Sequence, residues 1–404
     1  MLKAKITCAL FFITVLSYAQ DLTYLGELGA DALPSYMVNF SRIRTHILKK
    51  IDSTLSENVE NSYDSLVTSY TFLNTLEFYR YVVPCKYVND SIKLSGLLIV
   101  PKKSIRYKTI IYFHGTNPPL KSLAVPSDFN LRDKPRKMFF ELKYLMILAD
   151  LGYSVLVPDY IGYGESSIVE HPYTVIKPNV EATYTSYSSL QKKYPTKLNS
   201  SQGVISLGIS EGGAYALGMH KLLEQANKAL SVQSYPCEGP YNYNLTLKWL
   251  FNGSPKTKLG ILFYVWSAYS QLKYFYPYSS LGKNLFKIKR ISQRRIFKFN
   301  RFLGNNDTPY RYLNSVAISP ILKGNNLEIN TISSDHLIYN DWTPKGAITF
   351  FHSGRDQVVP EINTKETVQE LSGRTNNISF QYFPQKGHIS LWKTYFGYLI
   401  KNLK

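Results

Sequence analysis

Short apolar runs alternate with longer amphipathic stretches along most of the chain, and this alternation limits the fold more than any other feature. Runs such as KTIIYF at 108–113 and YSVLV at 153–157 are too short for helices and end in polar or glycine-containing loops. Continuous apolar strands of this kind are typical of parallel sheets that helices cover on both faces. The sequence therefore predicts an α/β chain with a mostly parallel sheet.

The expected elements follow one another in a regular order. Strands are expected at 79–87, 93–101, 108–113, 153–157, 203–207, 230–235, 347–352 and 378–383. Helices are expected at 138–150, 180–193 and 212–230, and from about 389 onward. In parallel sheets of this type, ligands bind beyond the carboxyl ends of the strands, so polar residues at those ends are the candidates for a functional site.

The alternation divides the chain into segments. Residues 76–239 and 346–404 carry the strand and helix pattern and are predicted to form two parts of one core. Residues 21–75 are polar with some helical spacing and are predicted to be an N-terminal helical wrap. Residues 240–345 lose the pattern, and a connection of that length is too long for a loop in a compact domain. We therefore predict an inserted, mainly helical cap between the two parts of the core.

The first 20 residues have the layout of a signal peptide. Lys3 and Lys5 precede a short apolar run at 6–16, and small residues at 17–19 offer a cleavage site. A transmembrane helix needs about 20 apolar residues, which is roughly twice the length of this run. The protein is therefore expected to be secreted or periplasmic.

Composition limits the partners of the chain. With 44% hydrophobic residues among 404, a large core is expected instead of disorder. The formal net charge is +19, and the stretch 283–298 within the predicted cap is rich in Lys and Arg and lacks Asp and Glu. This stretch is either a solvated rim or a contact for anionic surfaces. No nucleic-acid-binding module is recognisable, so nucleic acid is not expected as a partner.

The pentapeptide Gly208-Ile209-Ser210-Glu211-Gly212 matches the pattern G-x-S-x-G between an expected strand and an expected helix. In this pattern a sharp turn exposes the serine, and the glycines avoid clashes with neighbouring backbone. The N-terminus of the following helix carries partial positive charge, which stabilises a developing oxyanion. Ser210 is therefore the candidate nucleophile, with Gly208 and Gly212 as the glycines of the nucleophile elbow.

A serine hydroxyl needs an adjacent base, and His388 is the best-placed histidine, after an expected strand and before the last helix. Its imidazole needs a carboxylate that fixes the tautomer and stabilises the cation. Asp356 follows the expected strand AITFFH, so the order along the chain is Ser210, Asp356, His388, an order known for such sites. Asp335 and Asp341 are the alternatives for the acid.

Two more motifs stand at the ends of expected strands. His114-Gly115-Thr116 ends the run KTIIYF, and Pro158-Asp159-Tyr160 opens a glycine-rich loop after YSVLV. Together with the serine motif and the order of the three candidate residues, they resemble the α/β-hydrolase superfamily over 78–236 and 346–400. The resemblance is closest to secreted lipases and esterases, with some likeness to prolyl-oligopeptidase-type serine peptidases.

The resemblance implies roles for backbone groups. The N–H groups of Thr116 and Glu211 would form the oxyanion hole, and Asp159 would have an architectural role by bonding local backbone. The chain lacks an HGGG motif, which argues against the hormone-sensitive-lipase branch. The predicted cap matches no family that we recognise, and this leaves the substrate open.

These observations predict a serine hydrolase that cleaves carboxylic esters, with a small-molecule or lipid ester as substrate, through an acyl-enzyme on Ser210. No metal or organic cofactor is implied. The alternatives are a serine peptidase of prolyl-oligopeptidase type and a non-catalytic binding protein of the same fold. The cysteines outside the signal peptide, Cys85 and Cys237, form either one disulfide or two free thiols.

Overall fold

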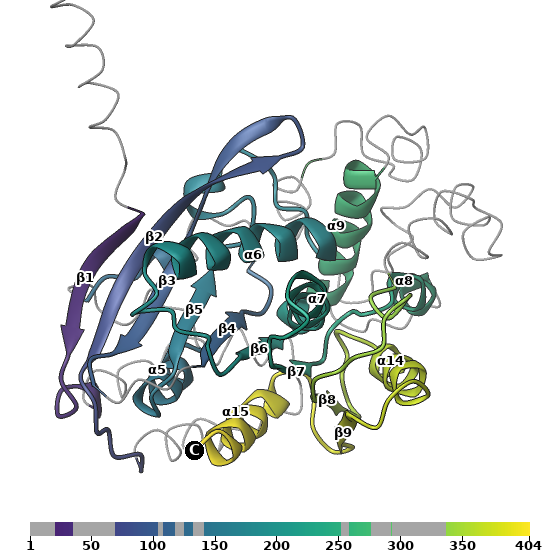
Figure 1. Cartoon of the computed structure of the whole chain (residues 1–404). Coiled ribbons are helices and arrows are strands. Elements are labelled where there is room, and N and C mark those ends of the chain that lie inside the picture. The colour runs from purple at the N-terminus through teal and green to yellow at the C-terminus, as the bar shows by residue number, and fades with distance from the viewer. Residues whose placement is uncertain are drawn as a thin grey trace, which may run out of the picture.

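The computed structural model describes residues 21–34, 69–103, 108–117, 125–131, 141–251, 258–275, 292 and 337–404. Within these ranges, nine strands form a single sheet in the order β1-β2-β3-β5-β4-β6-β7-β8-β9 (Figure 1). The strands are β1 (Leu22–Leu28), β2 (Leu76–Tyr87), β3 (Asp90–Pro101), β4 (Thr109–Phe113), β5 (Ser154–Pro158), β6 (Val204–Ile209), β7 (Val232–Cys237), β8 (Ile348–Ser353) and β9 (Ile378–Phe383).

The sheet is parallel over six neighbouring strands, from β5 through β4, β6, β7 and β8 to β9. The first three strands form an antiparallel meander that joins β5 at its edge. The described helices are α5 (Leu142–Asp150), α6 (Ile176–Lys193), α7 (Glu211–Ala226), α8 (Tyr243–Phe251), α9 (Lys258–Phe275), α14 (Ile362–Ser372) and α15 (Ser390–Asn402), together with two short 3-10 turns. The predicted α/β class is confirmed.

Helices cover both faces of the sheet (Figure 1). Side chains of α6, α7 and α9 share one apolar core with Leu156 and Val204, whereas those of α5 and α15 share a second core with Ile205 and Leu207. Successive residues of a strand point to opposite faces, so β6 contributes to both cores and all six of its residues are buried. This explains why its sequence, apart from Ser206, is apolar on both faces instead of alternating.

Residues 22–28 correct the prediction of a helical wrap at 21–75. They form β1, which pairs antiparallel with β2 and has an irregularity between Tyr24 and Gly26. β1 is the first strand in the sheet order, and its successive residues Leu22 and Thr23 are buried and exposed, as expected for side chains that point to opposite faces. Residues 35–68, which carry the helical spacing, lie outside the described residues.

Several other predictions fall partly or wholly outside the described ranges. The predicted signal peptide at 1–20 and the basic stretch 283–298, apart from residue 292, lie there. In the predicted cap, the structure describes α8, α9 and residues from 337 onward. Among the described residues, no helix combines the length and the apolar character that a membrane crossing requires. Cys85 and Cys237 are free thiols, so the disulfide alternative is wrong in this structure.

Candidate active site

Ser210 stands at the turn between β6 and α7. Its backbone φ is +55°, a value that non-glycine residues rarely adopt, and its amide donates to the Cys237 carbonyl at 2.8 Å. A Cβ atom on Gly208 would lie 2.0 Å from the Gly212 carbonyl oxygen, and one on Gly212 would lie 2.1 Å from the Phe113 carbonyl oxygen. The two glycines predicted for the elbow are therefore required by backbone packing, and they let the turn press against the end of β4.

His388 and Asp356 lie within hydrogen-bond distance of this turn. His388 precedes α15, and its Nε2 atom lies 2.9 Å from Ser210 Oγ. Its Nδ1 atom lies 2.7 Å from Asp356 Oδ2, on the loop after β8. The other Asp356 oxygen accepts the amides of Val358 and Val359 at 2.7 and 2.8 Å. The structure thus joins the three predicted residues into one hydrogen-bonded chain.

The charge on Asp356 is stabilised by its surroundings. Burial by itself raises the pKa of this carboxyl group, but the charge of His388 and the hydrogen bond from it outweigh burial and lower the pKa below its usual value. A carboxylate in this state holds the imidazole with its Nδ1 proton toward Asp356 and its Nε2 lone pair toward Ser210. The arrangement is therefore able to accept the serine proton.

The alternative acids lie elsewhere. Asp341 is an exposed residue with a φ of +50°. Asp335 lies outside the described residues. Asp159 is buried, accepts the Ser127 amide at 3.0 Å and the Ser95 hydroxyl at 2.6 Å, and has its pKa raised to about 6 by burial. These contacts fit the architectural role expected for Asp159, although its partners are distant in sequence.

Sequence reasoning missed a second carboxylate at the site. Glu238 directly follows β7, is fully buried and has a φ of +50°. Its Oε2 atom lies 3.4 Å from His388 Nδ1, and its Oε1 atom accepts the Ser353 hydroxyl and the Ser353 amide. No motif marks Glu238, but its place after the carboxyl end of a parallel strand was a usable signal.

A buried histidine lies next to this acidic pair. His352 is the next-to-last residue of β8, with Nδ1 2.7 Å from Thr364 Oγ1 and Nε2 3.6 Å from Asp356 Oδ2. Burial lowers the pKa of His352 to about 4, so the ring is neutral near neutral pH. Potential ligand atoms of Glu238, His352 and Asp356 lie within 4.8 Å of one another, a spacing that metal sites use. The Asp356 oxygens, however, are already hydrogen-bonded to His388 and to backbone amides.

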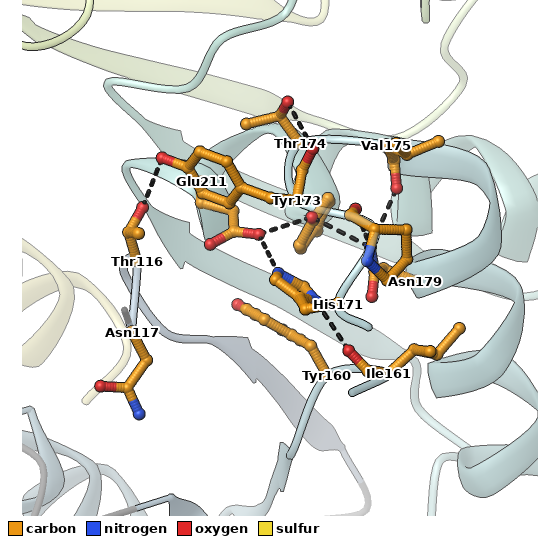
Figure 2. Close-up of polar contacts among 12 residues, drawn as sticks. Thr116, Asn117, Tyr160, Ile161, His171, Tyr173, Thr174, Val175, Asn179 and Glu211 are labelled. Atoms are coloured by element: carbon orange, nitrogen blue, oxygen red, sulfur yellow. Dashed lines mark hydrogen bonds and ion pairs between the residues drawn. The ribbon is translucent and has the colours of Figure 1, made fainter. Parts of the chain in front are cut away.

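The predicted oxyanion residues flank the serine on two elements. Glu211 is the first residue of α7, where backbone N–H groups lack partners inside the helix. Thr116 lies on the loop after β4, whose last residue, Phe113, pairs with Gly208. The Thr116 hydroxyl lies 3.0 Å from the Tyr173 hydroxyl, which fixes the loop from the side (Figure 2).

The Glu211 side chain points into a buried network that includes His171 (Figure 2). Its Oε1 atom lies 2.7 Å from His171 Nε2 and accepts the Tyr215 hydroxyl at 2.7 Å. His171 Nδ1 lies 2.7 Å from the Ile161 carbonyl oxygen. Both nitrogens of this ring therefore lie within hydrogen-bond distance of oxygen atoms, and these two contacts fix the orientation of the ring. No local sequence pattern pointed to this pair.

An aromatic cluster connects this network to α9, within the predicted cap. The Trp266 ring lies 5.6 Å from the His171 ring and stacks on Tyr173 with centroids 4.0 Å apart. Tyr160 stacks on the opposite side of the cluster, 5.7 Å from His171. Trp266 of α9 thus contacts His171, which bonds Glu211, and Tyr173, which bonds Thr116. In this way α9 supports both residues of the predicted oxyanion hole.

Comparison with known proteins yields structural likeness alone. No protein-family model and no curated protein sequence matches this chain. The rice cell wall degrading esterase LipA from Xanthomonas oryzae is similar in structure, with a TM-score of 0.71, 17% identity, and coverage of 95% of this chain and 97% of LipA. Candida antarctica lipase A in its closed state is similar with a TM-score of 0.57 and 17% identity, over 80% of this chain and 78% of the lipase.

The sheet order, the elbow after β6 and these similarities agree with one another. A shared architecture over most of three chains at such low identity establishes the fold and leaves the chemistry to the site. The resemblance to the superfamily, drawn from four short motifs, is confirmed at the level of fold. The chain has the α/β-hydrolase fold.

Proposed function

We propose that the protein is a serine hydrolase that cleaves carboxylic esters through an acyl-enzyme on Ser210. The observation that carries the proposal is the His388 imidazole, whose two nitrogens lie 2.9 Å from Ser210 Oγ and 2.7 Å from Asp356 Oδ2. The backbone strain at Ser210 supports the same assignment, because strain of this kind holds a nucleophile at the tip of a turn.

The geometry leads to a two-step reaction. His388 Nε2 accepts the Ser210 proton while Oγ attacks the ester carbonyl carbon, and Asp356 stabilises the resulting imidazolium. The amides of Glu211 and Thr116 donate to the oxyanion, aided by the N-terminus of α7. His388 then protonates the leaving alkoxide. In the second step His388 deprotonates a water molecule, which releases the acid from Ser210.

The structural neighbours support the ester over the peptide bond as the target. One of them is an esterase and another is a lipase. We propose a small-molecule or lipid ester as the substrate class, and export by the N-terminal segment as the route to it.

A substrate panel tests the proposal. Purified protein and its Ser210→Ala variant are assayed on p-nitrophenyl acetate, octanoate and palmitate beside peptide p-nitroanilides. The proposal expects ester turnover by the wild type and none by the variant. Turnover of anilides with no turnover of esters would make the protein a peptidase. If both proteins are inactive on all substrates and neither reacts with a fluorophosphonate, the binding-protein alternative stands.

A further inference from the structure

We infer that Glu238 is a second carboxylate partner of His388 and acts as a positioning residue beside Asp356. This inference rests on the proposed function, because it concerns the same imidazole. It assigns to the site two acids from two strands, where the sequence indicated one.

The fold brings the two acids to one ring nitrogen. β7 and β8 are parallel neighbours, and the Glu238 amide donates to the Phe351 carbonyl of β8 at 2.9 Å. Glu238 and Asp356 therefore leave the carboxyl ends of adjacent strands on the same side of the sheet. Their carboxylates lie 3.4 and 2.7 Å from His388 Nδ1, respectively. Asp356 makes the shorter contact, and Glu238 is within reach of the same proton.

The Glu238 side chain is held in place for this contact. Its Oε1 atom is fixed by the hydroxyl and the amide of Ser353, so Oε2 is left directed at His388. The positive φ of Glu238 is a further cost that the surrounding structure must offset. A glutamate that served only to cap the strand would not need a buried oxygen beside the imidazole.

The charges around His388 favour the same assignment. Burying a carboxylate is costly unless a cation or hydrogen-bond donors compensate for it. His352, the other histidine in the cluster, is neutral near neutral pH because burial lowers its pKa to about 4. The imidazolium that forms on His388 during the reaction is the cation that both acids contact. Its formation is therefore stabilised by Glu238 as well as by Asp356.

One consequence distinguishes this site from a triad with a single acid. When Asp356 is removed, the Nδ1 proton of His388 still has Glu238 as an acceptor. Loss of the acid in a single-acid triad lowers kcat by about 10⁴-fold because the tautomer is no longer fixed. Here we expect Asp356→Ala to lower kcat by roughly 10²- to 10³-fold, since Glu238 retains part of that control.

A double-mutant cycle tests the inference, with Glu238→Gln, Asp356→Ala and the double variant compared with wild type. We expect Glu238→Gln to lower kcat by about 3- to 10-fold relative to wild type. In the double variant, kcat should be lower by roughly 30-fold or more relative to Asp356→Ala. The acid limb of the kcat/KM profile should also move to lower pH in Glu238→Gln, because a lost neighbouring carboxylate makes the imidazolium less favourable. An equal factor in both backgrounds with an unmoved acid limb would overturn the inference.

Two further variants keep the test interpretable. Glu224→Gln is the matched control, because Glu224 is another buried glutamate bonded to a histidine. It lies roughly 20 Å from Ser210 along α7, at a helical rise of about 1.5 Å per residue. The control variant should leave the acid limb unmoved. If Glu238→Gln does not fold, Glu238→Asp retains the charge and withdraws it from His388 by one methylene. In the Asp356→Ala background it should then lower kcat, and no further loss would overturn the inference.

Fluorophosphonate labelling of Ser210, detected by mass spectrometry, distinguishes failure of this inference from failure of the proposed function. Labelling requires an activated serine but no ester turnover, so it is measured in the same four proteins. Labelling without ester turnover in wild type overturns the proposed substrate, and the cycle is then evaluated on labelling rates. Labelling that is equally fast in Asp356→Ala and in the double variant overturns the role of Glu238 alone. Absence of both labelling and turnover in wild type overturns both proposals.

Discussion

Two hydrogen-bonded groups, each made of a serine, a histidine and a carboxylate, lie near the two ends of α7. The two groups differ in the surroundings of the serine. Near the C-terminus of the helix, His220 Nε2 lies 3.0 Å from Glu224 Oε1, and its Nδ1 lies 2.7 Å from Ser234 Oγ. At the N-terminus, His388 also connects a serine with a carboxylate, but with the two ring nitrogens exchanged, Nε2 toward Ser210 and Nδ1 toward Asp356. Each group is a serine, a histidine and a carboxylate in hydrogen-bond distance, and all six residues are largely or wholly buried.

The two groups contain the same residue types, so the position of each serine in the fold is what distinguishes them. Ser234 lies inside β7 with regular strand pairing and no exposed surface. Ser210 lies on a strained turn at the free N-terminus of α7. Glu224 also accepts the Lys345 and Gly346 amides and the Trp342 indole N–H, so it joins α7 to the start of β8. The group at His220 is thus a structural link, whereas Ser210 lies beside the first residue of α7, whose amide we propose as an oxyanion donor.

The largest expected effect contrasts the two serines. Ser210→Ala should lower kcat on esters by about 10⁴-fold or more, because the nucleophile is lost while the fold is kept. Ser234→Ala removes one buried hydrogen bond and should cost about 1 kcal/mol of unfolding free energy with kcat unchanged. Kinetics and urea unfolding of both variants measure the contrast. Comparable kcat losses in the two variants would contradict it.

The next effect concerns the pair behind the nucleophile elbow. His171→Ala removes the hydrogen-bond partner of the buried Glu211 side chain and leaves a cavity, so it should lower the free energy of unfolding by about 3 kcal/mol. Because Glu211 also supplies a proposed oxyanion amide, kcat should fall by about tenfold or more with little change in KM. Urea unfolding and steady-state kinetics measure both. A stability loss with unchanged kcat would mean that the pair supports the fold alone.

A smaller effect is expected at the structural group. Glu224→Gln weakens hydrogen bonds to a charged group and should lower the free energy of unfolding by about 1–3 kcal/mol. Because Glu224 lies far along α7 from Ser210, kcat and its pH profile should not change. The measurement pairs urea unfolding with ester kinetics. A shifted pH profile would show that the two groups on α7 are coupled.

The smallest effect is the pH dependence of that stability difference. Burial raises the pKa of Glu224, but hydrogen bonds from His220 and the Gly346 amide outweigh it and lower the pKa from 4.5 to about 2. A lowered carboxyl pKa stabilises the folded state fully above pH 4.5, and this contribution is lost as the pH falls toward 2. The gap between wild type and Glu224→Gln should therefore be constant above pH 4.5 and narrow below it. Urea midpoints at a series of pH values measure the gap, and widening in acid would reverse the assigned sign.

The class of the fold was predictable because its central strands are buried on both faces. β6 has six buried residues, and its sequence is apolar apart from Ser206. β1 was not predicted, because an edge strand with one exposed face and a glycine irregularity has the mixed sequence LTYLGEL. Its pairing depends on β2, which lies about 50 residues away in sequence, and no local pattern reports such a partner.

The candidate site divides in the same way. The turn at Ser210 is marked by two glycines, because a Cβ atom added to Gly208 or Gly212 would lie 2.0 or 2.1 Å from a backbone oxygen. Glu238 is marked only by its place after β7, and His171 by no pattern, since each reaches the site through tertiary packing. Residues that act through a partner distant in sequence carry no spacing of their own, so the structure was needed to find them.

Covalent labelling tests the central claim, that Ser210 is activated and Ser234 is not. Wild-type protein, Ser210→Ala, Ser234→Ala and His388→Ala are treated with a fluorophosphonate, and the adducts are located by peptide mass spectrometry. We expect one adduct, on Ser210, in wild type and in Ser234→Ala, and no adduct in Ser210→Ala. In His388→Ala, labelling of Ser210 should be slower by orders of magnitude. An unlabelled wild type, or labelling that persists in Ser210→Ala, would contradict it.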